Sequence, residues 1–134
     1  FGLFTIILLG ESMIAVMQGM ERQETWSLPA AAAAFGGMAV AFFFWWWYFD
    51  GPGAAGAHPL RARRHLWRFH VWAYGHSPLY LGIAVTGVGF EHVITAGGVM
   101  LHHGELALLS GAVALTAAVL SGLGLAGGRG AVPA

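Results

Sequence analysis

The run FGLFTIILLGESMIAVMQGM, residues 1–20, is apolar apart from a few side chains that include Glu11, Ser12 and Gln18. Its length matches the roughly 20 residues that an α-helix needs to cross the hydrocarbon core of a bilayer. Three further apolar runs follow at about 28–49, 70–97 and 105–126. In lipid, every backbone N–H and C=O group must be hydrogen-bonded within the protein, which favours helices or a closed barrel. No run alternates apolar with polar residues as the strands of a barrel do, so we expect helices. The sequence predicts an all-α, polytopic transmembrane bundle of four spans, forming one domain over residues 1–134.

The composition supports a lipid environment. Of the 134 residues, 57% are hydrophobic and only 9% are charged, against about 25% charged in an average soluble domain. The formal net charge is zero, which gives no electrostatic reason to expect a nucleic-acid partner. The chain has no cysteine, which excludes disulfides and thiolate chemistry. Motifs for nucleotide binding, Ser/His/Asp hydrolysis, HExxH zinc chemistry and EF-hands are missing. We therefore expect no cofactor and no enzymatic activity.

The distribution of arginine predicts the orientation. The link at 51–69 carries four arginines, whereas the link at 21–27 carries one with two glutamates beside it. By the positive-inside rule the basic 51–69 link is cytoplasmic, and the links at 21–27 and 98–104 are outside. The eight consecutive aromatic residues of 42–49, which end at Asp50, are interpreted as an anchoring belt at the cytoplasmic boundary.

The chain opens on Phe1 and has no basic segment that would indicate a secretory signal. We expect it to be part of a longer protein. Its expected partners are the lipid bilayer and the remaining transmembrane helices of that protein. No feature of the sequence defines an oligomeric state.

Glu11 is the most informative side chain, because a charge near the centre of a span opposes insertion by about 2.5–3.5 kcal/mol. Glu11, Ala15, Gln18 and Arg22 follow at helical spacing and form one small and polar stripe. We expect this stripe to face protein and not lipid. Two interpretations stay open: a proton- or cation-handling acid in a transport path, or a buried hydrogen bond that fixes helix packing.

The third span carries a second polar stripe, formed by His76, Tyr80, Gly87 and Glu91, with His92 adjacent. His76 and Glu91 lie about 22 Å apart along a helix and cannot touch. They mark either the two mouths of one pathway or two separate packing sites. Imidazole titrates near neutrality, so a proton relay is chemically available.

Small residues predict close helix packing, because they let neighbouring backbones approach each other in lipid. The third span has glycines at heptad spacing, and the fourth span repeats small residues along one face. The predicted packing positions are Gly10 in the first span, Gly75, Gly82 and Gly89 in the third, and Ala107, Gly111, Ala114, Ala118 and Gly122 in the fourth.

Two polar groups lie at the ends of spans. His102, His103 and Glu105 are weak candidates for metal ligands, and a solvated loop is the simpler interpretation. Asp50 faces the arginine-rich link, where we expect it to form an interfacial ion pair.

Three strings in series resemble the bacterial low temperature requirement A family: FGLFTIILLGES at 1–12, FFFWWWYFD at 42–50 and YGHSPLYLGIAVTGVGFEH at 74–92. The resemblance implies a multi-pass protein of the bacterial inner membrane whose molecular activity is not established. The positions that it marks are Gly10, Glu11, Asp50, Tyr74, Gly75, His76 and Glu91.

Two functions are therefore expected. One is a transporter or channel-like module in which Glu11, His76 and Glu91 line a polar route. The alternative is a non-transporting membrane component that supports the membrane in the cold, with the same residues holding helices together. An intramembrane or metal-dependent enzyme is a third possibility, with little in the sequence to favour it.

Overall fold

The computed structural model describes residues 1–25, 27–51, 64–97 and 103–127, with side chains at 64–69, 71, 126 and 127 left out. The described residues form four helices: α1 (Gly2–Glu21), α2 (Leu28–Asp50), α3 (Arg64–Thr95) and α4 (His103–Gly127). Each contains an apolar segment long enough to cross a membrane, with mean hydropathies of 1.7, 1.7, 1.2 and 2.1. The predicted all-α fold with four membrane-spanning helices is confirmed for this part of the chain.

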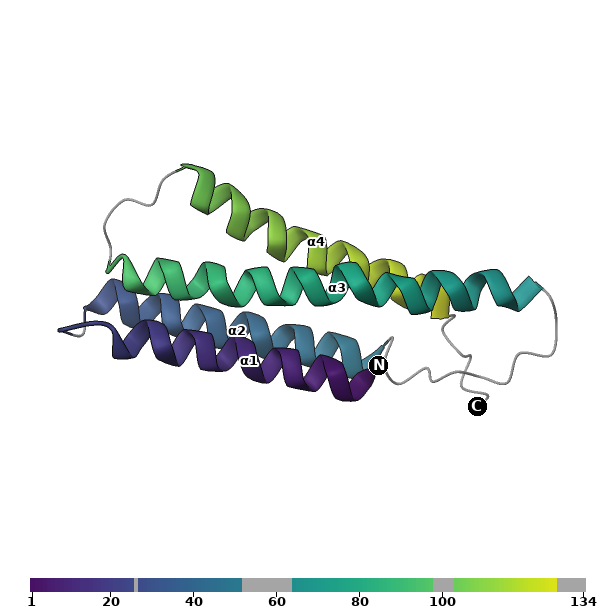
Figure 1. The fold of residues 1–134 in the computed structure, drawn as a ribbon, viewed down its shortest axis with the longest axis horizontal. Helices are drawn as coiled ribbons and strands as arrows, with labels where there is room; N and C mark the ends of the chain where they lie inside the picture. The colour runs from purple at the N-terminus through teal and green to yellow at the C-terminus, as the bar shows by residue number, and fades with distance from the viewer. Residues whose placement is uncertain (26, 52–63, 98–102, 128–134) are drawn as a thin grey trace.

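Helix α3 begins earlier than the sequence predicted. The predicted span starts near His70, whereas the helix starts at Arg64, so Arg64 and Arg68 of the predicted basic link belong to the helix. Its apolar spanning part is Trp72–Thr95. The eight residues of α3 that precede this part extend the helix past the other helices at that end, as Figure 1 shows. Periodicity and hydropathy locate the apolar part of a helix but not a polar extension of it.

Two polar residues of the link between α1 and α2 cap helix ends. The Ser27 hydroxyl accepts a hydrogen bond from the Ala30 amide (3.3 Å) at the start of α2, where Pro29 occupies the first turn. The Gln23 side-chain amide donates to the carbonyls of Ile94 (2.8 Å) and Thr95 (3.1 Å) at the end of α3. The Ile94 carbonyl also accepts from the Gly97 amide (3.0 Å), so Gln23 adds to the bonds that complete the last turn of α3.

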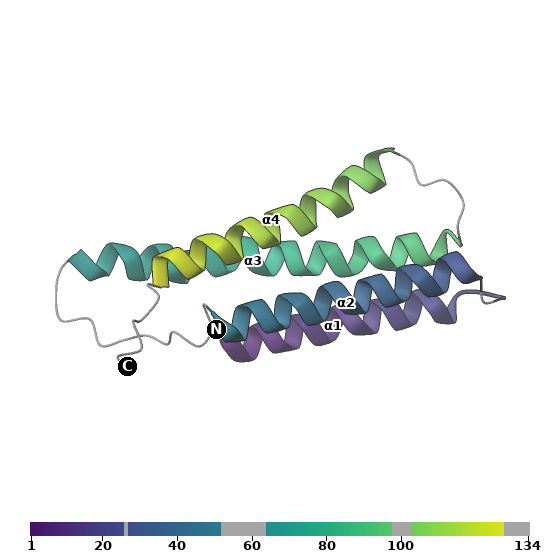
Figure 2. The ribbon, with the colours of Figure 1, turned by 180° about the vertical axis from the view of Figure 1, so that it is seen from behind.

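The helices form two groups around α3. α1 and α2 lie side by side on one side of α3, and α4 lies on the other and diverges from α1 and α2 toward its His103 end (Figures 1 and 2). α3 packs most extensively against α1 and α4, whereas α2 and α4 touch only slightly. α3 is therefore the central helix, and α1 runs parallel to it.

The glycine heptad of α3 faces α4. A Cβ added to Gly75 would lie 2.8 Å from the Leu123 side chain, and one added to Gly89 would lie 2.8 Å from the Leu109 side chain. A Cβ at Gly82 would overlap the Thr116 hydroxyl. The three partners on α4 also repeat every seven residues, in reverse order because the two helices run antiparallel (Figure 1). Glycine lets them pack closely here, as expected for helices in lipid.

The small-residue stripe of α4 does not take part in this packing. Gly111 and Gly122 have no neighbour within 4 Å of an added Cβ, and the same holds for Gly10 on α1. Every residue of the stripe is exposed, whereas the opposite face of α4 is buried against α3 through Ala112, Thr116, Leu120 and Leu123. Gly10, Gly111 and Gly122 make no such contact among the described helices, and their packing role stays a prediction. Larger side chains on α4 fill the space that the glycines of α3 leave.

The aromatic run of α2 is divided between core and surface. Phe44 and Tyr48 are 3% and 1% exposed, whereas Phe42, Phe43, Trp45 and Trp46 are exposed. Helical spacing of four places Phe44 and Tyr48 on the same face. Two members of the run belong to the buried core with Leu9, Leu79 and Ile83. Only the exposed rings are therefore available for the predicted anchoring belt.

Gly82→Ala is expected to lower the thermal stability of the purified protein in detergent, because the new methyl group must displace the Thr116 hydroxyl from its hydrogen bond to the Ala112 carbonyl (2.8 Å). Overpacking of this kind destabilises by about 1–3 kcal/mol. Gly111→Ala is the matched control, with no neighbour to displace, and should melt at the parent temperature or slightly above it. Equal melting temperatures for both variants would contradict the close α3–α4 contact.

Candidate functional site: the polar groove between α1 and α3

The two polar stripes expected from the sequence lie along the same seam. Because α1 and α3 run parallel, Phe4 of α1 contacts Tyr80 of α3 (ring centroids 4.7 Å apart), and Arg22 pairs with Glu91 at the other end. Between these two contacts lies a groove of about 210 Å³. Its walls are α1 residues from Leu8 to Gln18, including Glu11, and the α3 residues Ala84, Gly87 and Val88. The stripes of the first and third spans thus form one site.

Glu11 lies at the midpoint of α1 and lines this groove. Its side chain is exposed, and in the part of the chain that the structure describes no hydrogen bond or ion pair reaches it. Gln18 is two turns further along the same face and is also exposed. The expectation that this stripe is covered by protein is not met by the four helices. Glu11 therefore lines the groove without a partner among the described residues.

Ser12 forms the floor of the groove and joins its two walls. The hydroxyl lies 3.0 Å from the Leu8 carbonyl on its own helix and 3.3 Å from the Ile83 carbonyl on α3. Gly87 makes this approach possible, since an added Cβ there would lie 3.0 Å from the Ser12 Cα. No role of Ser12 was expected from the sequence. Its position on the same helical face as Leu9, Val16 and Gly19, all buried, was the available signal.

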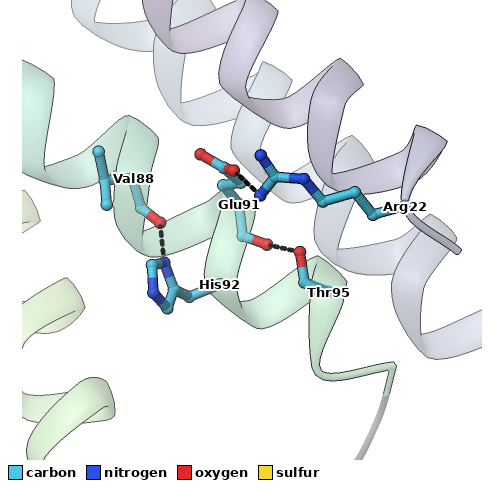
Figure 3. Close-up of polar contacts among 5 residues, drawn as sticks. All are labelled: Arg22, Val88, Glu91, His92 and Thr95. Carbon is cyan, nitrogen blue, oxygen red and sulfur yellow. Dashed lines mark hydrogen bonds and ion pairs between the residues drawn. The ribbon is translucent and has the colours of Figure 1, made fainter.

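An ion pair lies just beyond the end of the groove that Gln18 and Val88 line. The Arg22 guanidinium donates to the Glu91 carboxylate, and their side chains are 59% and 15% exposed (Figure 3). The backbone carbonyl of Glu91 also accepts from the Thr95 hydroxyl (2.8 Å). His92 extends away from the pair, and its Nδ1 donates to the Val88 carbonyl (3.0 Å). Glu91 is thus paired, whereas Glu11 is not.

His76 lies in the core and not in the groove. It is fully buried, and its Nδ1 lies 2.7 Å from the Trp72 carbonyl. Because a carbonyl only accepts, Nδ1 carries the proton, and Nε2 accepts from the Tyr48 hydroxyl at 3.1 Å. Tyr48, on α2, was not anticipated as a partner, because nothing in the sequence pairs it with a residue of the third span. Both ring nitrogens are therefore satisfied.

His76 and Glu11 do not meet. The His76 ring contacts Phe1, with ring centroids 4.5 Å apart, and Glu11 is ten residues further along α1, about 15 Å at the rise of a helix. Phe1, Trp72 and Tyr80 surround the imidazole. The expected route through Glu11, His76 and Glu91 is therefore not continuous: two of its members lie at the groove and one is in the packed core.

The remaining polar candidates lie elsewhere on the surface. Tyr74 is exposed and stacks on the His70 ring, and Asp50 is exposed at the end of α2. The arginines expected to pair with Asp50 have no described side chains. His103 and Glu105 are exposed at the start of α4, and His102 lies outside the described residues. Among the described side chains, no three His, Asp or Glu residues converge as metal ligands.

Comparison with protein families gives one match. The model of a family described as bacterial low temperature requirement A protein (LtrA) matches residues 1–131. The match covers all four helices and the whole groove. No curated protein and no solved structure matches the chain.

Tyr48→Phe is expected to destabilise the protein by about 1–3 kcal/mol, because it leaves the buried Nε2 of His76 without a donor. Tyr74→Phe makes the same chemical change at an exposed ring and should leave the melting curve in detergent unchanged. If both variants melt like the parent, the Tyr48–His76 hydrogen bond does not contribute to stability.

Proposed function

Since the chain belongs to the bacterial low temperature requirement A family, we propose that this multi-pass membrane protein works in the bacterial inner membrane as a transporter or channel-like module. The α1–α3 groove is the proposed site, and Glu11 is the residue that binds the transported proton or cation. The polar route expected from the sequence, through Glu11, His76 and Glu91, therefore loses His76. Glu11 and Glu91 belong to the site, and His76 supports it from the core.

The observation that carries this proposal is the environment of Glu11. A carboxylate at the middle of a span is unfavourable in hydrocarbon and is a functional candidate by default. Here the carboxylate shares a groove with Gln18, and no arginine, lysine or histidine among the described side chains neutralises it. A proton or a cation would supply the missing positive charge. The small residues Ala15, Ala84 and Gly87 in the walls of the groove leave room for such an ion.

The non-transporting role is the second candidate, and several contacts favour it. Ser12, Gln23 and His76 each use their polar groups to join two helices or to complete a helix end. In that role Glu11 and Gln18 would form hydrogen bonds to further protein covering the groove. Such contacts would stabilise the assembly without moving any solute.

We propose no catalytic reaction at this site. The Ser12 hydroxyl lies between two backbone carbonyls, where its proton is already committed. Among the described side chains, Glu11 is the one ionisable group that lines the groove, so a general base has no second group to work with.

Glu11→Gln is expected to reduce proton or cation flux to the level of protein-free vesicles, because the amide keeps the shape of the side chain but cannot bind a proton or neutralise a cation. The full protein is reconstituted into liposomes, and flux is driven by a potassium diffusion potential and followed with a trapped pH-sensitive dye, then with sodium and potassium indicators. Glu24→Gln, a change outside the groove, should conduct like the parent.

Parent and Glu11→Gln proteins that conduct equally would remove Glu11 from the mechanism. If the parent shows no flux for any of the ions and Glu11→Gln mainly lowers the melting temperature, the non-transporting role is the correct one.

A further inference from the structure

The ion pair of Arg22 and Glu91 lies across one end of the groove. Gln18, the groove residue nearest that end on α1, precedes Arg22 by one helical turn, and Val88 precedes Glu91 by three residues on α3. Arg22 is the C-cap of the helix that forms one wall, and Glu91 belongs to the helix that forms the other. Figure 3 shows the guanidinium reaching from α1 to the carboxylate on α3. The pair therefore bridges both walls at the mouth.

Neighbouring contacts hold this bridge in place. The Arg22 amide donates to the Gln18 carbonyl (3.2 Å), and the adjacent Gln23 side chain is bonded to the last carbonyls of α3. Gln23 therefore fastens the end of α1 to the end of α3 next to the pair. Glu91 is only 15% exposed, so most of its surface is covered, whereas the more exposed Arg22 can turn into water when the pair opens.

The other directions into the groove are less accessible to an aqueous ion. The opposite end is bounded by the Phe4–Tyr80 ring contact, and the Tyr80 hydroxyl is bonded to the Phe1 carbonyl (3.2 Å). The open side faces the hydrocarbon or whatever protein covers it, and hydrocarbon excludes charged solutes. An ion that approaches Glu11 from the Arg22 end passes the ion pair, which lies directly beyond the groove residues Gln18 and Val88.

We infer that the Arg22–Glu91 ion pair is a gate that controls the access of ions to Glu11. The inference rests on the groove assigned in the proposed function. It does not require that anything be carried across the membrane. Opening consists of breaking the pair, after which the guanidinium is solvated outside the groove.

The chain has no cysteine, so a single introduced thiol reports on access. Gln18→Cys places the thiol just inside the pair. The full protein is held in lipid nanodiscs, which expose both membrane faces, and is treated with a membrane-impermeant trimethylammonium thiosulfonate. Met13→Cys is the control, because Met13 is 41% exposed on α1 but does not line the groove.

In the otherwise unchanged protein, the thiol of Gln18→Cys should be modified slowly. Adding Glu91→Gln should accelerate modification about tenfold, because the rate follows the fraction of molecules in which the mouth is open. Loss of the carboxylate also weakens attraction for the cationic reagent, so a faster reaction cannot come from charge. Arg22→Gln should give the same acceleration from the other side of the pair, and the exchanged pair Arg22→Glu with Glu91→Arg should return the slow rate.

Three results would overturn the gate: fast modification of Gln18→Cys in the presence of the intact pair, no acceleration when either partner is replaced, or equal acceleration at Met13→Cys. The last result means that the helices have separated and that the pair is only structural. Flux measurements decide the proposed function separately. Gated labelling together with flux that ignores Glu11→Gln would leave the gate standing and reject Glu11 as the transporting acid.

Discussion

The structure depends on one constraint: hydrocarbon hydrates neither backbone amides nor charges. Each segment must therefore close its own hydrogen bonds as a helix, and polar side chains must find partners at helix ends or between helices. Gln23 and Ser12 meet this requirement with backbone carbonyls, and His76 meets it with Tyr48 and a carbonyl. Glu11 does not meet it within the described helices. This exception is what makes the groove a candidate site.

Two ionisable residues that are equivalent in sequence terms have different environments. His76 and Glu11 each lie inside an apolar run, but the first is enclosed by aromatic rings with both nitrogens bonded. The second lies at a wall kept open by small residues on both helices. The bonded imidazole is suited to hold α2 against α3. The free carboxylate is suited to bind a charge. Packing, and not residue type, separates their roles.

The sequence predicted the number, type and approximate limits of the helices, because bilayer thickness and apolar length determine them. It also predicted the two polar stripes. The two stripes share one groove because α1 and α3 are neighbours. Helical periodicity predicts the face of a helix that is polar, but it does not predict which helix lies against that face. The glycines illustrate the same limit: those at 75, 82 and 89 face a neighbour, whereas those at 111 and 122 do not. Small residues permit close packing, but the partner's side chains decide where it occurs.

The most direct test of the groove is whether water reaches Glu11 inside the bilayer. Water-edited solid-state NMR of glutamate-labelled full protein in lipid measures how fast magnetisation passes from water to each carboxyl carbon. A hydrated groove predicts that the Glu11 signal grows nearly as fast as that of Glu24 in the link between α1 and α2. A Glu11 signal that grows as slowly as those of lipid-facing side chains would contradict a polar site between α1 and α3.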